Sequence, residues 1–156
     1  MRRLIALLCA VLLTVSLAAC GGGKTKTADP AALADAMLEA LEPQGETIEA
    51  AGEVAANYYA IGDEVQEYRV YLSAMYIAEE VAVFRLADAK NAEPVKKMCE
   101  TRIQDLKDQF EDYLPEEYRA VNDNAVVLAE GDIVAMVVGT AEGVAAAKAV
   151  FEKTVK

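Results

Sequence analysis

The first nineteen residues decide which part of the chain is left to form a domain. Met1-Arg2-Arg3 is a short basic start, and residues 4 to 19 carry no charge and are almost wholly apolar. A basic start, a short apolar run and small residues before a cleavage point are typical of a secretory signal peptide. The apolar run is also shorter than the ~20 residues that a membrane-spanning helix needs. We therefore expect residues 1–19 to be a cleaved signal peptide.

The apolar run closes with Leu17-Ala18-Ala19-Cys20, which resembles the lipobox of bacterial lipoprotein precursors at each of its four positions. The resemblance implies that the Cys20 thiol receives a diacylglyceryl group and becomes the mature N-terminus. Two or more acyl chains give stable anchoring. The alternative is an ordinary cleaved signal peptide with an incidental cysteine. We predict lipid attachment at Cys20 and a protein held at the extracytoplasmic face of the cell membrane.

A polar, glycine-rich segment, Gly21 to Thr27, follows the cysteine. We expect residues 20–28 to form the lipidated cysteine and a flexible tether, which would reach about 15–18 Å. Residues 29–156 then suit a single domain with one core. Cys9 leaves with the signal peptide and Cys20 is predicted to carry lipid, so Cys99 is left alone and no intramolecular disulfide can form.

Charge excludes some classes of partner. Removal of residues 1–19 takes away two arginines and no acid, which leaves 13 basic against 26 acidic residues and a net charge near −13. Proteins that bind nucleic acid carry a basic face, so no nucleic-acid partner is expected. Adhesion to anionic lipid by charge alone is also unfavourable, and the predicted lipid must provide the anchor.

Hydrophobic periodicity predicts an α+β domain with the element order ααββαββα, in which a four-stranded antiparallel sheet is packed by helices. Two successive ββα units hint at an internal duplication. The expected elements are a helix that starts with Asp29-Pro30 and ends before Pro43, a loop over 44–52, a helix over 53–60, strands over 68–73 and 81–86, a long helix capped by Asp88 or Asn91 and ended by Pro115, strands over 125–129 and 133–138, and a last helix capped by Thr140.

The same patterns predict which side chains face the core. In the first pair of strands, Ser73 opposite Val81 would place Val70 opposite Phe84 on the core side. The short second helix would turn Val54 and Tyr58 inward. The long helix carries one apolar stripe, and the last helix a shorter one. These stripes are Cys99, Ile103, Leu106, Phe110 and Tyr113, and Val144, Ala147, Phe151 and Val155.

Residues from about Pro30 to Val155 resemble domain of unknown function 4358, a family of small bacterial lipoproteins. The resemblance implies a lipoprotein location and an α+β fold, and it implies no activity and no site residues. The stretches that carry it are Ala78 to Phe84, Arg102 with Gln109 and Phe110, Tyr113 to Glu117, and the segment Asn124 to Val127 with Gly131, Val137 and Val138.

Catalytic chemistry finds little support in the sequence. The chain has no histidine, so a serine or cysteine triad would lack its usual base. Cys99 lies on an apolar stripe, where a free cysteine behaves as a small hydrophobe; a reactive thiol is the alternative. The acidic residues of the long helix are interleaved with Arg102 and Lys107 and indicate a solvated face instead of a metal or glycosidase site. No catalytic residue, metal ligand or cofactor is predicted. These acidic residues are Asp105, Asp108, Glu111 and Asp112.

Arg69, Tyr71 and Arg85 are the candidate binding residues. In the expected register Arg69 and Arg85 lie opposite each other on the outer face of the sheet, beside Tyr71. Opposed like charges are unfavourable unless an anion neutralises them. We predict a small anion-binding or glycan-binding patch with Tyr71 as its stacking platform. The alternative is that the two arginines pair with the nearby Glu67 and Asp88.

The second pair of strands is apolar on both sides, with no polar face in 125–129 or 133–138. Such strands are buried on both faces or reserve one face for another molecule. We expect the N-terminal helices to cover the second face through Leu33, Met37 and Tyr58. The alternative is an interface with a second copy of the chain or with another protein.

These features favour a membrane-anchored binding or accessory module that acts on a protein or another partner in the cell envelope. Two alternatives stay open: a small enzyme that uses acidic residues, and a purely structural envelope component.

Overall fold

A computed structural model describes residues 28–73 and 76–156. The predicted signal peptide, Cys20 and the predicted tether as far as Thr27 lie outside the described residues. The α+β class is confirmed. The elements are α2 (Pro30–Leu41), β1 (Thr47–Ala50), α3 (Glu53–Ala56), β2 (Val65–Ser73), β3 (Glu80–Leu86), a 3-10 turn (Ala89–Asn91), α4 (Ala92–Phe110), α5 (Pro115–Asn124), β4 (Val126–Glu130), β5 (Ile133–Val138) and α6 (Ala141–Val155).

The sheet is antiparallel throughout, with the strand order β1-β2-β3-β5-β4. It has five strands instead of the four predicted, because β1 forms within the expected loop over 44–52. β1 is only four residues long, and only Ala50 in it is buried. Four residues are too few to show the alternation of polar and apolar side chains that would distinguish an edge strand from a loop.

The pairing of β2 with β3 is shifted by two residues from the predicted register. Val70 lies opposite Ala82, and Arg69 lies opposite Val83 instead of Arg85. A shift of two residues leaves every side chain on its predicted face, so burial alone could not select between the two registers.

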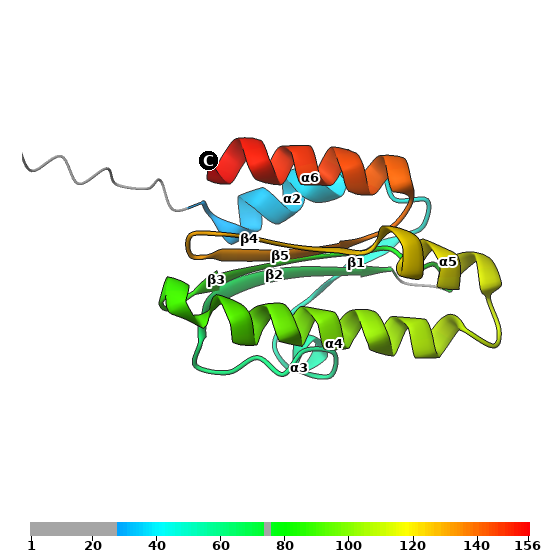
Figure 1. Ribbon diagram of the computed structural model, residues 1–156, viewed down its shortest axis with the longest axis horizontal. Helices are drawn as coiled ribbons and strands as arrows, with labels where there is room; N and C mark the ends of the chain where they lie inside the picture. Colours follow the sequence, from blue (N-terminus) through cyan, green and yellow to red (C-terminus); the bar gives the residue numbers. More distant parts are fainter. Residues whose placement is uncertain (1–27, 74–75) are drawn as a thin grey trace, which may run out of the picture.

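The sheet is covered on both faces, which gives three layers (Figure 1). Helices α2 and α6 lie side by side on one face, and α4 covers the other with α3 and α5. The helices of the two ββα units, α4 and α6, therefore pack on opposite faces, which gives the suggested duplication no support. The core on the α2 side includes Leu33, Met37, Val83, Ile133 and Phe151, and that on the α4 side includes Val70, Phe84, Cys99, Leu106 and Met136.

Every residue of β5 is buried, so this strand of the second hairpin is covered on both faces within the chain, whereas the edge strand β4 is only partly buried. Leu33 and Met37 cover the α2 side, as expected. Tyr58 does not, because it lies on the α4 side, where its ring packs over Arg102.

Helix ends follow the predicted caps in two cases. The Asp29 carboxylate accepts a hydrogen bond from the Ala31 N–H, and the Thr140 hydroxyl accepts one from the Gly143 N–H, at 3.0 and 3.1 Å. Pro115, expected only to end the long helix, stands in the first turn of α5, where proline is well tolerated.

Three core assignments were wrong. Helix α3 ends at Ala56, after one turn. Val54 and Tyr58 are 46% and 42% exposed, and the neighbouring Ala55 and Tyr59 are buried instead. Helix α4 ends at Phe110, so Tyr113 falls beyond the apolar stripe and is 82% exposed. Within the described ranges no helix is both long and apolar enough to cross a membrane.

Candidate functional site

The residues predicted to form a binding patch, Arg69, Tyr71 and Arg85, are each engaged within the sheet and helix α2. Arg69 forms an ion pair with Glu49, and Arg85 forms one with Glu67. The Tyr71 hydroxyl donates a hydrogen bond to Asp35. Burial and then this hydrogen bond raise the pKa of Tyr71 to about 12. Binding at these residues stays a prediction, and the contacts do not favour it because both arginine charges are already neutralised.

Asp88, the other expected partner, accepts a hydrogen bond from the Lys90 N–H instead. Arg85 Nε is buried without a hydrogen-bond partner among the described residues.

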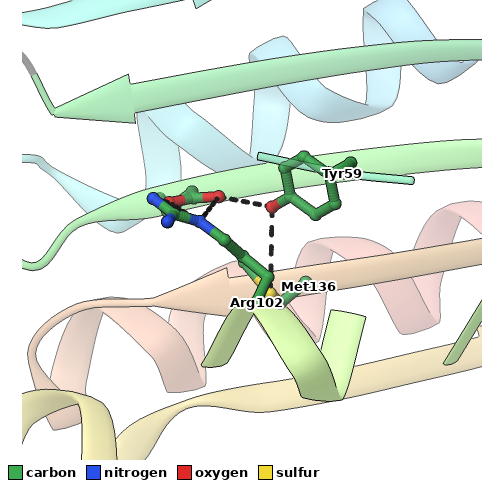
Figure 2. Close-up of polar contacts among 4 residues, drawn as sticks. Tyr59, Arg102 and Met136 are labelled. Atoms are coloured by element: carbon green, nitrogen blue, oxygen red, sulfur yellow. Dashed lines mark hydrogen bonds and ion pairs between the residues drawn. The ribbon is translucent and has the colours of Figure 1, made fainter. Parts of the chain in front are cut away.

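A buried ion pair that the sequence analysis missed lies on the other side of the sheet. Glu80, the first residue of β3, and Arg102, near the middle of α4, are 3% and 7% exposed. Arg102 Nη2 lies 2.7 Å from Glu80 Oε2, and its Nε lies 3.1 Å from both carboxylate oxygens. The Tyr59 hydroxyl donates a hydrogen bond to Glu80 Oε1 and lies 3.9 Å from Met136 Sδ (Figure 2).

Arg102 was assigned to a solvated face because it stands among charged residues. Its spacing indicates a buried position instead. Arg102 follows Cys99 by three residues and precedes Leu106 by four, and residues at these spacings lie on the same face of a helix. The buried residues of α4 are Val95, Cys99, Arg102, Leu106 and Phe110.

The electrostatics of this cluster favour a fixed charge pair over proton transfer. Burial raises the pKa of Tyr59 well above its usual value, and the negative charge of Glu80 raises it further. Burial lowers the pKa of Arg102, but the hydrogen bonds and charge of Glu80 outweigh this and leave it raised. At neutral pH Tyr59 is therefore a neutral donor and Arg102 a cation, and neither serves as a general base.

Arg102 is also the floor of a cavity of about 270 Å³ at the end of the sheet. The Tyr58 ring covers the guanidinium, with its centroid 4.6 Å from Cζ, a cation–π contact. Ser73 Oγ, in the wall, is buried without a hydrogen-bond partner among the described residues. The lining residues are Ile48, Tyr58, Leu72, Ser73, Ile77, Glu79, Glu80, Arg102, Leu106, Gln109 and Phe110.

A second buried acid, Glu79, stands next to this cavity and is 5% exposed. Its carboxylate accepts hydrogen bonds from the Gln44 N–H at 2.9 and 3.0 Å and from the Gly45 N–H at 3.3 Å. Glu117, from α5, accepts a hydrogen bond of 2.7 Å from the Ala78 N–H. The two acids thus hold the start of β3 between α5 and the turn that follows α2.

A second cavity, of about 190 Å³, adjoins the first, and a third, of about 450 Å³, adjoins the second. The first and the smaller one share Ile77 and Glu79, and the smaller and the larger one share Gln44 and Thr140. We call these three adjoining cavities the acidic groove. Six carboxylates line it, Glu42, Glu79, Glu80, Glu116, Glu117 and Glu142, against one cation, Arg102. A further cavity, of about 420 Å³, shares Glu116 and Glu117 with the groove and brings a second cation, Arg119, close to it. Among the described residues, only Glu80 of the six has an ion-pair partner.

The remaining chemical candidates lie in the core or on the surface. Cys99 is fully buried, and burial followed by the charge of Glu80 raises the pKa of its thiol to about 12. Asp105, Asp108, Glu111 and Asp112 are exposed. In the part of the chain that the structure describes, no group of three or more histidine, cysteine or acidic side chains could hold a metal ion.

Comparison with known proteins adds one finding. The family model of a domain of unknown function, DUF4358, matches residues 39–139. No curated protein and no solved structure matches the chain. Several stretches that carry the family resemblance meet at the acidic groove: Glu79 and Glu80, Arg102, Gln109 and Phe110, and Glu116 and Glu117. Because the matched region covers more than half of the chain, the protein belongs to the DUF4358 family.

Proposed function

We propose that the protein is a lipid-anchored binding module of the cell envelope, attached to the extracytoplasmic face of the membrane through Cys20. In this proposal the signal peptide is removed, Cys20 carries the lipid, and the acidic groove receives the partner. The bacterial lipoprotein location rests on the lipobox resemblance and on the family.

The observation that carries the proposal is that the groove and the start of the described chain, at Ala28, lie at opposite ends of the domain. Helix α2 begins after Asp29, next to the predicted tether, and its last residue, Leu41, lines the groove together with Glu42. A helix of 12 residues spans about 18 Å. The β4–β5 turn and the end of α6 lie at the attachment end, and α5 lies at the groove end (Figure 1). An anchor at Cys20 would leave the groove free for a partner.

Several features favour binding over catalysis. The chain contains no histidine, the Cys99 thiol is protonated at neutral pH, and Glu80 is held by Arg102. Glu79 and Glu117 accept backbone hydrogen bonds, which restrict them as general acids or bases. A purely structural role is less favoured, because a connected groove with exposed Ile48 and Tyr58 at its mouth adds nothing to the domain core.

Site-directed photocrosslinking in the native membrane tests the proposal. A benzophenone side chain would replace Tyr58 in the groove and, as the matched control, Lys153 near the end of α6. We expect one discrete adduct from Tyr58 and none of that mass from Lys153. Adducts of equal yield at both positions, or no adduct at the groove, would contradict a binding role for this end of the domain.

A further inference from the structure

We propose that the acidic groove binds an extended polypeptide segment that carries a lysine or arginine beside an apolar side chain. The inference rests on the proposed binding function and names the chemistry of the partner. It is carried by two adjoining cavities, one whose walls combine apolar side chains with the Glu80–Arg102 ion pair and one whose charged lining residues are all acidic.

The first cavity has room for an apolar side chain beside its polar lining groups. Its walls include Ile48, Leu72, Ile77, Leu106 and Phe110. Ile48 and Tyr58 at its mouth are 44% and 42% exposed. The remaining charged groups on its floor are satisfied, because Arg102 is bound by Glu80 and covered by Tyr58. An entering apolar group would therefore displace water from this cavity without breaking an ion pair.

Exposed aromatic residues extend this surface. Tyr76, 74% exposed, directly precedes the lining residue Ile77, and Tyr113, 82% exposed, follows the lining residue Phe110 by one turn. Tyrosine is enriched at protein interfaces because it offers a large apolar ring together with a polar tip. Of the five large hydrophobic side chains found exposed in the described ranges, Ile48 and Tyr58 line this cavity, and Tyr76 and Tyr113 lie within three residues of a lining residue in the sequence.

The second cavity suits a cation. Glu79, Glu116 and Glu117 line it, no lysine or arginine does, and no ion pair neutralises any of the three among the described residues. Glu79 is 5% exposed, and a buried carboxylate is costly unless a cation or hydrogen bonds compensate it. Backbone hydrogen bonds compensate Glu79 in part, and no cation pairs with it among the described residues, so a lysine or arginine in this cavity would add a charge-assisted hydrogen bond.

The arrangement favours a polypeptide over other cationic ligands. The two cavities share Ile77 and Glu79, so one extended chain could place neighbouring side chains in both. A simple amine would use only the acidic cavity and leave the apolar one to water. Nucleic acid and anionic lipid are disfavoured because the groove and the whole chain are negatively charged.

The binding test uses the full-length protein purified from membranes in neutral detergent. Three blocked hexapeptides serve as probes: one alternates leucine and lysine, one alternates leucine and glutamate, and one alternates serine and lysine. Fluorescence anisotropy at two salt concentrations measures the affinity. We expect the leucine–lysine peptide to bind more tightly than the other two, and its affinity to fall as salt screens the charges.

Matched variants locate the site. Glu116→Gln with Glu117→Gln removes two groove carboxylates, and Glu130→Gln with Glu152→Gln removes two exposed ones that do not line the groove. The groove variant loses two partly exposed ion pairs to the peptide, so we expect its Kd to rise about fivefold. The control variant should leave Kd nearly unchanged. Ile48→Ser should also weaken binding, whereas Val54→Ser, at a residue of similar exposure outside the cavity, should not.

Three results would overturn the inference. The first is equal affinity for the lysine and glutamate peptides, and the second is equal loss in the groove and control variants. In the third, lysine amide alone binds as tightly as the peptide, which would assign the groove to a small amine. If photocrosslinking at Tyr58 still traps a partner, the binding module stands and only the chemistry of its ligand is wrong. If no adduct forms and no peptide binds, both proposals fail.

Discussion

At the scale of single residues, Glu80 and Arg102 combine two roles, because they belong to the core and also form the floor of the groove. Their side chains are 3% and 8% exposed, so each charge depends on the other for compensation. A buried pair of this kind adds little net stability, but the loss of one partner leaves an uncompensated charge in the core.

We therefore expect Arg102→Leu to lower the free energy of unfolding by about 3–5 kcal/mol. The double variant with Glu80→Leu should lose much less than the sum of the two single losses, because neither charge is left alone. Urea unfolding of the four proteins in a double-mutant cycle measures this. Additive losses would show that the two residues do not interact.

Cys99 provides a prediction that depends on pH. The folded protein holds its thiol proton up to about pH 12, whereas the ordinary pKa is 9.0. Between these pH values the folded state binds more protons than the unfolded state, so the free energy of unfolding must fall as pH rises. Cys99→Ala should remove this part of the pH dependence and leave the loss that Tyr59 and Tyr71 cause as pH rises through about 10. Urea unfolding at pH 8 and pH 10 measures the difference.

The labelling rate of Cys99 provides the independent check. At pH 8 the native thiol should react slowly with a thiol reagent, because it is protonated and fully buried. Rapid labelling of the folded protein would contradict its place in the core.

At the scale of secondary-structure elements, the long and strongly patterned segments could be predicted and the short ones could not. Helices α2 and α6 followed from their caps and apolar stripes, and β3 and β5 from continuous apolar runs. Strand β1 has only four residues, too few for a hydrophobic period. Helix α5 is short and mostly polar, and it buries only Val121. Their positions depend on contacts made after the chain has folded, such as the hydrogen bond from Ala78 to Glu117.

Strand β5 offers a test of the layered arrangement. Ile133 packs toward α2 and α6, and Val134 toward α4. We expect Ile133→Glu and Val134→Glu each to lower the free energy of unfolding by more than about 3 kcal/mol, because each buries an unpaired charge. Ala129→Glu on the exposed edge of β4 is the matched control and should cost little.

Circular dichroism during urea unfolding measures these variants, and sedimentation measures their association. If Ile133→Glu or Val134→Glu folds with normal stability but the protein no longer self-associates, that face of the hairpin is an interface between chains and the three-layer arrangement is incomplete.

At the scale of the whole molecule, the site depends on topology that the sequence pattern could not supply. The groove brings together the turn after α2, the start of β3, the second half of α4 and the first turn of α5. These segments are far apart in the chain, and all except α4 contribute acids to the groove that look like ordinary solvated residues in the sequence. Only the fold shows that these acids share one surface, and that this surface lies away from the attachment end.

The location and orientation of the proposed binding module depend on the modification of Cys20, so the mass of the native N-terminus is the most direct test of this central claim. The protein would be purified from the membranes of cells that produce it, and its N-terminal peptide analysed by mass spectrometry. We expect the peptide to begin at Cys20 and to carry a diacylglyceryl group. Cys20→Ala should take up no acyl label and should accumulate as the uncleaved precursor or as a released form. A native N-terminus at another residue, an unmodified Cys20, or acyl label that persists in Cys20→Ala would contradict the account.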